Sequence, residues 1–202
     1  MPGIGEPFGR LREYVARLPD GLDSYPECVA KGSIARLALQ DFEWRDVYDS
    51  LPDPLREGLR HRPLPSAWIP EVHSVALHMA AADAEGLSTE DVMKWSHESN
   101  TRLAESPMYR IVAAVASPTA LLRTAAVSWR LLHRGVSLSI DAQQRGLTEA
   151  SIHHPPHLWN ELVHQSTAQG LRAAVEAAGG RDVHAEVVSY EPECARYRLK
   201  WT

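Results

Sequence analysis

Histidines are the residues of this sequence with the clearest capacity for chemistry. The chain of 202 residues contains ten of them, and four lie together in the segment HHPPHLWNELVH. Neutral imidazole is a common ligand of metal ions and of haem iron. His157 and His164 are spaced so that, in a helix, they lie two turns apart on one face. We therefore treat His157 and His164 as candidate metal ligands.

A metal or haem site is one of two interpretations of these histidines. His153 and His154 are neighbours in an alternating segment, so only one of them can face the interior. His133 lies one helical turn after Trp129, at the end of a preceding helical pattern. The other interpretation is that most of the histidines lie on a solvated turn and that His164 is a hydrogen-bonded core residue.

The elements that must position these histidines form the last third of the chain. Apolar and polar residues alternate in four segments, which predicts strands at 136–142, 147–153, 183–190 and 196–201. Between the two pairs, the period of the apolar residues predicts a helix over 157–178. The sequence therefore predicts a ββαββ unit in which a four-stranded antiparallel sheet carries one helix across a face.

The middle of the predicted helix is unusually slim. Ser166 and Gly170 stand where a long amphipathic helix normally carries bulky side chains, and glycine costs about 1 kcal/mol there relative to alanine. Tight packing against the sheet explains this pattern, and so does a cavity beside the helix. Both interpretations stay open at the level of sequence.

The upstream residues are predominantly helical in pattern. They include the apolar stripes of KGSIARLALQDF and of EVHSVALHMAAADA, a capping box that begins at Ser88, and a helix start at Ser117-Pro118. The fold class expected is α+β, with an N-terminal helical layer packed on the C-terminal four-stranded sheet. Residues 1–27 are expected to form an extension, and residues 28–202 a single ligand-binding-like domain.

Composition restricts the classes of partner. The net charge of −5, with no basic run, argues against nucleic acid. No apolar run approaches the roughly 20 residues of a membrane span, and the N-terminus lacks the features of a signal peptide, so a cytoplasmic protein without a membrane partner is expected. Cys28 and Cys194 are expected to be free thiols, since two distant cysteines make neither a disulfide framework nor a zinc site.

Known catalytic patterns are missing from the sequence. It contains no Gly-rich phosphate loop, no Gly-x-Ser-x-Gly and no His-Glu-x-x-His. Glu149 and Glu161 are the acidic residues nearest the histidines, and nothing in their spacing demands acid–base work. We predict no catalytic residue and favour a function without catalysis.

Several short motifs together resemble a known group of proteins. They are the Lys-Gly-Ser of KGSIARLAL, the Ser-x-Trp-x-Pro of LPSAWIPEVH, a Ser-Pro helix start, the turn Gly-Gly-Arg-Asp-Val and a final aromatic-x-Leu-x-Trp strand. Over about residues 28–201 the chain resembles an uncharacterised bacterial, myxobacterial-type family. That family is similar to 4-vinyl reductase-type and haem-NO-binding-like domains that bind small molecules.

The resemblance implies a helical layer against an antiparallel sheet, a homodimer, and a small hydrophobic ligand in a sensor domain. Sensor-type relatives often carry metal-holding cysteines before the final strand. This chain has only Cys194 at that place, which argues against a zinc site.

The sequence is therefore compatible with three functions. The first is a sensory module whose apolar pocket, between helices and sheet, binds a small hydrophobic ligand. The second is a haem or metal protein that uses the histidines, and the third is a dimerisation adaptor with a filled core. The residues expected to line the pocket are His164, Trp129, His133, Tyr109, Ser166, Gly170 and Trp159.

Overall fold

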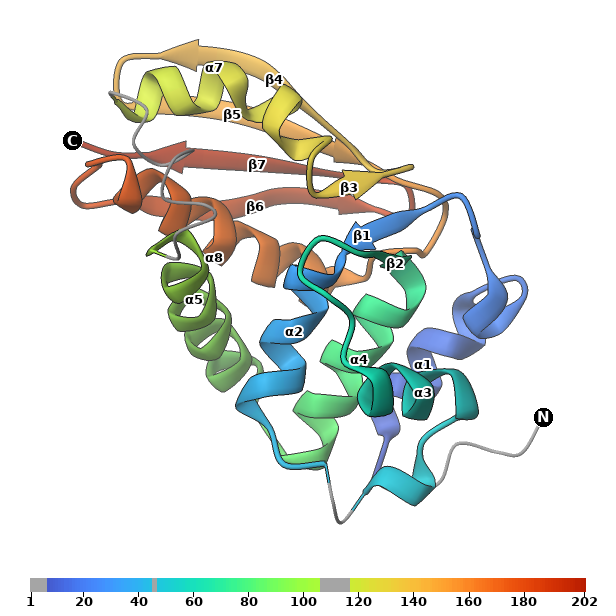
Figure 1. Cartoon of the computed structure of the whole chain (residues 1–202). Helices are drawn as coiled ribbons and strands as arrows, with labels where there is room; N and C mark the ends of the chain where they lie inside the picture. Colours follow the sequence, from blue (N-terminus) through green and yellow to red (C-terminus); the bar gives the residue numbers. More distant parts are fainter. Residues whose placement is uncertain (1–6, 45–46, 106–116) are drawn as a thin grey trace. The chain divides into compact units, whose positions relative to one another are not determined.

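The computed structural model describes residues 7–44, 47–105 and 117–202. The chain divides into two compact units. The N-terminal unit comprises the residues up to Ser88 together with Leu131–Gly135 and Pro155–Leu158, and the C-terminal unit comprises Thr89–Arg130, Val136–His154 and Trp159–Thr202. Each unit has its own antiparallel sheet (Figure 1).

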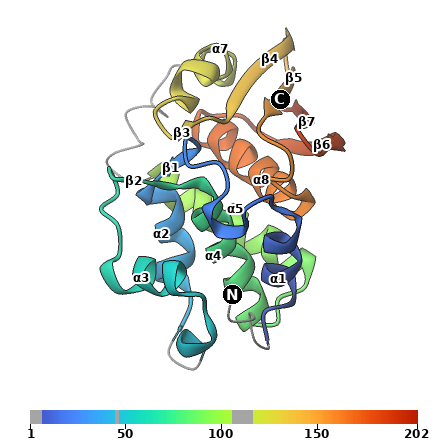
Figure 2. The same cartoon turned by 90° about the vertical axis from the view of Figure 1, so that its right-hand side faces the viewer.

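The N-terminal unit is built around one buried helix. Its helices are α1 (Gly9–Arg17), α2 (Gly32–Asp41), α3 (Asp53–His61) and α4 (Glu71–Ala84), with short 3-10 turns at Gly21–Asp23 and Tyr48–Ser50. Figure 2 shows α4 with α1 on one side and α2 and α3 on the other. Val72 and Ala76 of α4 and Phe8 and Leu11 at α1 are fully buried. Part of the predicted extension therefore contributes to the core of this unit.

A three-stranded sheet in this unit was not predicted from the sequence. It consists of β1 (Val29–Lys31), β2 (Trp68–Pro70) and β3 (His133–Arg134), in the order β2-β1-β3. Strands of two or three residues are too short for alternation to reveal them. Gly135 ends β3 with a φ of +77°, and a Cβ there would collide with Cys28, so this position requires glycine.

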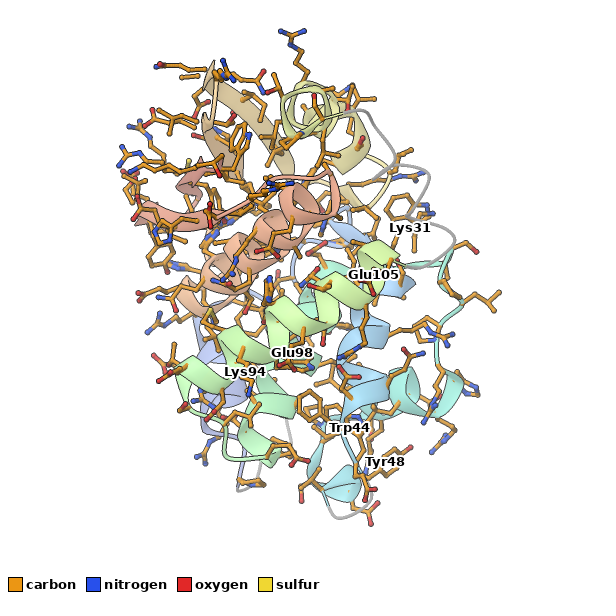
Figure 3. All side chains as sticks on the ribbon, turned by 90° about the vertical axis from the view of Figure 1, so that its left-hand side faces the viewer. Lys31, Trp44, Tyr48, Lys94, Glu98 and Glu105 are labelled. Carbon is orange, nitrogen blue, oxygen red and sulfur yellow. The ribbon has the colours of Figure 1, made fainter. Side chains whose placement is uncertain are left out.

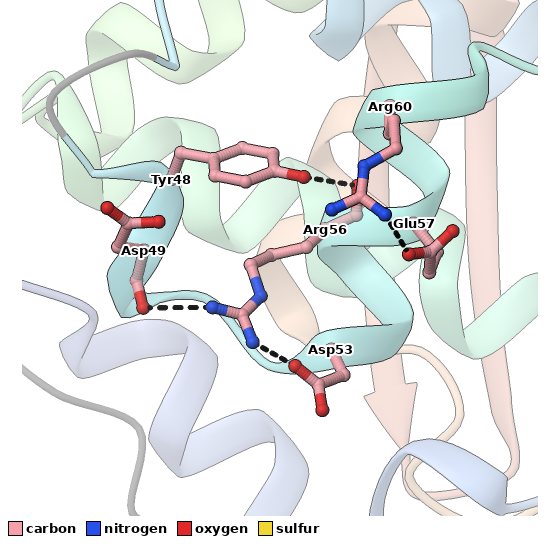
Figure 4. Close-up of polar contacts among 6 residues, drawn as sticks. All are labelled: Tyr48, Asp49, Asp53, Arg56, Glu57 and Arg60. Atoms are coloured by element: carbon pink, nitrogen blue, oxygen red, sulfur yellow. Dashed lines mark hydrogen bonds and ion pairs between the residues drawn. The ribbon is translucent and has the colours of Figure 1, made fainter.

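Charged side chains on the surface of α3 are paired locally. The Arg56 guanidinium contacts the Asp53 carboxylate and donates to the backbone oxygen of Asp49, and Arg60 donates to Glu57 at 2.6 Å (Figure 4). Such exposed pairs contribute between 0 and about 1 kcal/mol each. They show how the basic side chains of this helix are neutralised.

The predicted ββαββ unit is confirmed in the C-terminal unit. Its strands are β4 (Ser137–Gln144), β5 (Leu147–His153), β6 (His184–Glu191) and β7 (Cys194–Lys200). They form one antiparallel sheet in the order β4-β5-β7-β6. The buried face carries Ala150 and Ile152 of β5 and Ala195, Tyr197 and Leu199 of β7, as the alternation predicts.

Among the described residues of this unit, the helices beside the sheet are α5 (Thr89–Glu105), α7 (Pro118–Trp129) and α8 (Glu161–Ala177). Helix α7 lies along β4, α8 lies along β6, and α5 packs against α8 (Figure 1). The Ser117 hydroxyl caps α7 by accepting the Ala120 N–H, which confirms the predicted helix start. The segment MYRIVAAVA (108–116), whose pattern is also helical, lies entirely outside the described residues.

The start of the long helix was predicted wrongly. It begins at Glu161 rather than His157, because the Asn160 side chain caps it by accepting the Val163 N–H at 3.0 Å. Pro155 and Pro156 lie in the short loop that connects β5 to this helix. His157 lies in that loop with a φ of +60°, so it shares no helix face with His164.

Candidate functional site

The C-terminal unit contains a group of contacting rings around His164, which we call the His164 cluster. It consists of Trp129, His154, Trp159, His164, Tyr190 and Tyr197. His164 lies in the first turn of α8 and is fully buried. Two strands bring polar rings to it. Tyr197 is on the buried face of β7, and His154 directly follows β5.

Both ring nitrogens of His164 are hydrogen-bonded. Its Nδ1 is 2.6 Å from the Tyr197 hydroxyl oxygen, and its Nε2 is 3.1 Å from Nε2 of His154. A neutral imidazole carries one donor and one acceptor nitrogen. With the Tyr197 O–H donating to Nδ1, the Nε2–H of His164 donates to His154, and each polar group has a partner. These two hydrogen bonds, which we call the relay, agree with one of the two interpretations of the sequence, in which His164 is a hydrogen-bonded core residue.

Burial keeps His164 and Tyr197 uncharged. Desolvation, and then the neighbouring His154, lower the pKa of His164 to about 3. Desolvation also raises the pKa of the Tyr197 hydroxyl well above its ordinary value. At neutral pH His164 is therefore a neutral imidazole and Tyr197 a protonated phenol, and both can orient a polar ligand atom without supplying a charge.

Two predicted pocket residues complete the cluster. The rings of Trp129 and Trp159 meet edge to face with centroids 6.0 Å apart, and Trp159 meets His164 in the same way at 5.6 Å. The indole N–H of Trp129 donates to the backbone oxygen of Val136 at 3.1 Å. The structure thus brings Trp129, Trp159 and His164 together, as the sequence predicted for these three.

Gly170 and Ser166 have a different setting from the one expected. A Cβ at Gly170 would lie 3.1 Å from Oδ1 of Asn100 on α5, so the glycine accommodates a neighbouring helix. The neighbour that Gly170 accommodates is therefore α5, and a cavity beside Ser166 and Gly170 stays a prediction. Ser166 is half-buried on the same helix.

The remaining predicted residues do not join the cluster. His133 belongs to the N-terminal unit, where its Nδ1 is 3.0 Å from Oε2 of Glu71 and both side chains are buried. His157 is half-buried in its loop. Tyr109 lies outside the residues that the structure describes.

Sequence reasoning missed four residues of the His164 cluster and the His133 pair, namely His154, Tyr190, Tyr197 and Glu71. His154 was named only as one of two alternatives at a strand end, and the structure selects it. Tyr197 shares its strand face with Ala195 and Leu199, a pattern visible in the sequence. Glu71 gave no signal, because only the tertiary fold places it beside His133.

An unpaired hydroxyl lies on the same sheet face as Tyr197. Thr148 is fully buried, and its Oγ1 has no hydrogen-bond partner. Thr148 pairs with Leu199 in the register, two residues along from the pair of Ala150 with Tyr197. Buried hydroxyl groups nearly always have a partner, so this atom marks a place where one is lacking.

The described residues do not assemble a conventional metal centre. In the ranges 7–44, 47–105 and 117–202, no group of three or more His, Cys, Asp or Glu side chains is arranged to hold a metal ion. The Cys194 sulfur is 4.0 Å from Nε2 of His153, and this pair is exposed. Cys28 and Cys194 are both free thiols, as expected. Within the same ranges, no helix has the length and apolar character to cross a membrane.

Comparison with known proteins gives a result for the fold alone. No family model matches the chain, and no curated protein matches it. Among solved structures, a doubly substituted Tt H-NOX protein is 13% identical with a TM-score of 0.59, over 85% of this chain and 95% of that chain. An oxygen-binding H-NOX domain related to soluble guanylate cyclases, in its oxygen complex, is 12% identical with a TM-score of 0.56, over 85% and 92%.

A third structure extends this result. The Fe(II) unliganded H-NOX protein from K. algicida is 9% identical with a TM-score of 0.52, over 85% of this chain and 96% of that chain. The likeness to haem-NO-binding-like domains, expected from the sequence, is thereby confirmed for the fold. The 4-vinyl reductase-type likeness and the myxobacterial grouping stay predictions. The chain is an α+β protein with the fold of H-NOX domains.

Proposed function

We propose that this chain is a non-catalytic module that binds a small, largely apolar molecule and serves as a sensor. The observation that carries the proposal is the buried, unpaired hydroxyl of Thr148, on the sheet face that also presents Tyr197. Ligand sites are typically apolar walls with a few placed polar groups. The aromatic rings around His164 supply such walls. The fold likeness to an oxygen-binding H-NOX domain supports the sensory role.

Thr148→Val tests this proposal against its matched control, Thr148→Ser. Valine has the shape of threonine without the hydroxyl, whereas serine keeps the hydroxyl. We expect Thr148→Val to lose a molecule that co-purifies with the full chain, as measured by native mass spectrometry, and Thr148→Ser to retain it. The ligand-free Thr148→Val chain should also gain about 1 kcal/mol or more in free energy of unfolding, because a buried group without a partner is removed. Equal retention by both variants would contradict the proposal.

Haem binding is the second candidate function. The hydrogen-bond partners of each buried histidine indicate which of them could bind the iron. His164 does not fit an iron ligand, because both of its ring nitrogens are already hydrogen-bonded within the cluster. His133 fits better. Metal-ligating histidines usually donate their other ring N–H to a carboxylate, and Nδ1 of His133 is 3.0 Å from the buried Glu71 carboxylate. Haem, held there by His133, would supply an iron that binds a diatomic gas.

Hemin titration of the purified full chain tests this candidate. We expect an absorption band of histidine-ligated haem that His133→Ala abolishes. The control is His157→Ala, which removes a half-buried imidazole from a loop. An unchanged spectrum in His133→Ala, or no band in the wild type, would exclude His133 as the ligand.

Homodimer formation is the remaining part of the proposal. The two edge strands of the C-terminal sheet, β4 and β6, each carry an irregularity, at Ile140/Ala142 and at Val187/Ser189. Bulges of this kind protect sheet edges against pairing with another chain. A dimer should therefore form through another surface, and light scattering of the full chain over a range of concentrations measures whether it forms. A monomer throughout would favour a single-chain sensor over the adaptor function.

A further inference from the structure

Two sequence motifs that the proposed function does not use meet in the N-terminal unit. The Lys-Gly-Ser motif ends β1 and begins α2, and the Ser-x-Trp-x-Pro motif leads into β2. The Lys31 ammonium donates to the backbone oxygen of Ser66 at 2.8 Å, and the Gly32 N–H donates to that of Ala67 at 2.8 Å. Lys31 also pairs with Trp68 in the β1–β2 register. The fold thus joins motifs that are far apart in the sequence.

Two cations contact the same indole ring at this junction. The Lys31 Nζ lies 3.9 Å from the centroid of the Trp68 ring, and the Arg134 guanidinium carbon lies 4.2 Å from it. The register places these three residues on the outer face of the sheet, since Ala30 and His133 are buried on the other face. Exposed cation–π contacts are worth about 0.5–1 kcal/mol each. These contacts hold the two side chains in place but do not neutralise their positive charges.

Neither cation is neutralised by a carboxylate. In the part of the chain that the structure describes, no ion pair involves Lys31 or Arg134, whereas Arg56 of α3 is paired with Asp53 (Figure 4). Figure 3 shows the Lys31 side chain projecting from the ribbon at this position. Two unpaired cations side by side are unexpected in a chain with a net charge of −5.

Two exposed leucines lie in the segments that contact the backbone around Lys31. Leu64 is 69% exposed and Leu131 is 62% exposed, which is unusual for large apolar side chains. The Leu64 oxygen accepts the Ala67 N–H at 2.9 Å, and the Ala67 oxygen accepts the Gly32 N–H at 2.8 Å. The oxygen of Leu132, which follows Leu131, accepts the Lys31 N–H at 2.8 Å. We call the group of Lys31, Leu64, Trp68, Leu131 and Arg134 the Trp68 surface.

We propose that the Trp68 surface is a docking site for an acidic, apolar peptide segment of a partner protein. The two fixed cations would pair with carboxylates, and the leucines and Trp68 would bury apolar side chains of the same segment. A long polyanion such as nucleic acid suits this surface poorly, because two cations cannot offset the repulsion from a negatively charged chain. Complementary charge also speeds encounter with an acidic partner.

Fluorescence anisotropy of the full chain with a labelled peptide of leucine and glutamate tests the proposal. We expect saturable binding that is lost when glutamine replaces each glutamate in the peptide. The double variant Lys31→Gln/Arg134→Gln should weaken binding about tenfold or more, as the loss of two charge contacts predicts. The matched control is Arg181→Gln/Lys200→Gln, which changes the net charge equally at exposed positions of the C-terminal unit and should bind normally.

Leu64→Asn provides a second, independent variant. Its side chain is mostly solvated, so the substitution leaves the fold intact, and we expect it to weaken binding as well. Equal weakening by the two double variants would show unspecific electrostatics and overturn the proposal. Absence of peptide binding by the wild type, or binding instead to anionic vesicles or to a second copy of the chain, would also overturn it.

Discussion

Each of the two units buries a histidine, but the partners of the two imidazoles differ in kind. In the N-terminal unit His133 meets the Glu71 carboxylate, and both are almost fully buried. In the C-terminal unit His164 meets the Tyr197 hydroxyl and the ring of His154. The first arrangement pairs an imidazole with a carboxylate, whereas the second keeps His164 as a neutral imidazole.

This difference separates two ways of placing a polar group in a core. A buried carboxylate requires its partner, because the protein interior solvates a lone charge poorly. A neutral relay requires only that donors and acceptors alternate. The first therefore suits a site that holds a cation or metal-bound group, and the second suits a site that orients an uncharged ligand.

Breaking the Glu71–His133 pair should have the largest effect. Glu71→Leu leaves His133 without its carboxylate and should lower the free energy of unfolding by about 3–5 kcal/mol in urea denaturation. The double variant Glu71→Leu/His133→Leu should regain part of that loss, because neither member of the pair is then buried without the other. A double variant no more stable than Glu71→Leu would show that the hydrogen bond between the two side chains does not account for the loss.

Breaking the neutral relay should cost somewhat less. His164→Leu keeps the apolar stripe of α8 but leaves the Tyr197 hydroxyl and the His154 nitrogen without their partner, at a cost of about 2–4 kcal/mol. Tyr197→Phe removes a single partner and should cost about 1–2 kcal/mol. A double-mutant cycle of the two substitutions should reveal coupling, and additive effects would contradict the relay.

Acid should destabilise the wild type through the relay. The pKa of His164 is about 3 in the folded chain against an ordinary value of 6.5, because burial disfavours the imidazolium. Between these values the unfolded chain binds more protons, so stability is complete above pH 6.5 and falls as the pH is lowered. The slope contributed by His164 is about 1.4 kcal/mol per pH unit.

The His164→Leu variant serves as the control for this pH dependence. It lacks the titrating group, so its free energy of unfolding should fall less steeply between pH 6.5 and 4.5 than that of the wild type. Parallel curves for the two proteins would assign the acid sensitivity to other buried histidines, such as His73 and His78, whose pKa values burial also lowers.

Part of this comparison could be predicted from the sequence. Alternation and helical period predicted the ββαββ unit, and the stripe through His164 predicted that its ring faces inward. The three-stranded sheet escaped prediction because its strands have two or three residues, and the pairing of Glu71 with His133 depends on contacts across more than 60 positions. The helix predicted from residue 157 begins at Glu161, since the Asn160 side chain caps it by accepting the Val163 N–H.

The smallest predicted effect concerns Gly170, in the middle of α8, and its packing against α5. Gly170→Ala gains about 1 kcal/mol in helix propensity but places a methyl group 3.1 Å from Oδ1 of Asn100, whose amide is held by a hydrogen bond to the backbone oxygen of Ser96. The two effects should nearly cancel in the wild type. In an Asn100→Ala background the contact is gone, so Gly170→Ala should there stabilise the chain by about 1 kcal/mol in thermal unfolding. If the substitution has the same effect in both backgrounds, α5 does not explain the glycine, and the cavity interpretation of residues 166–170 returns.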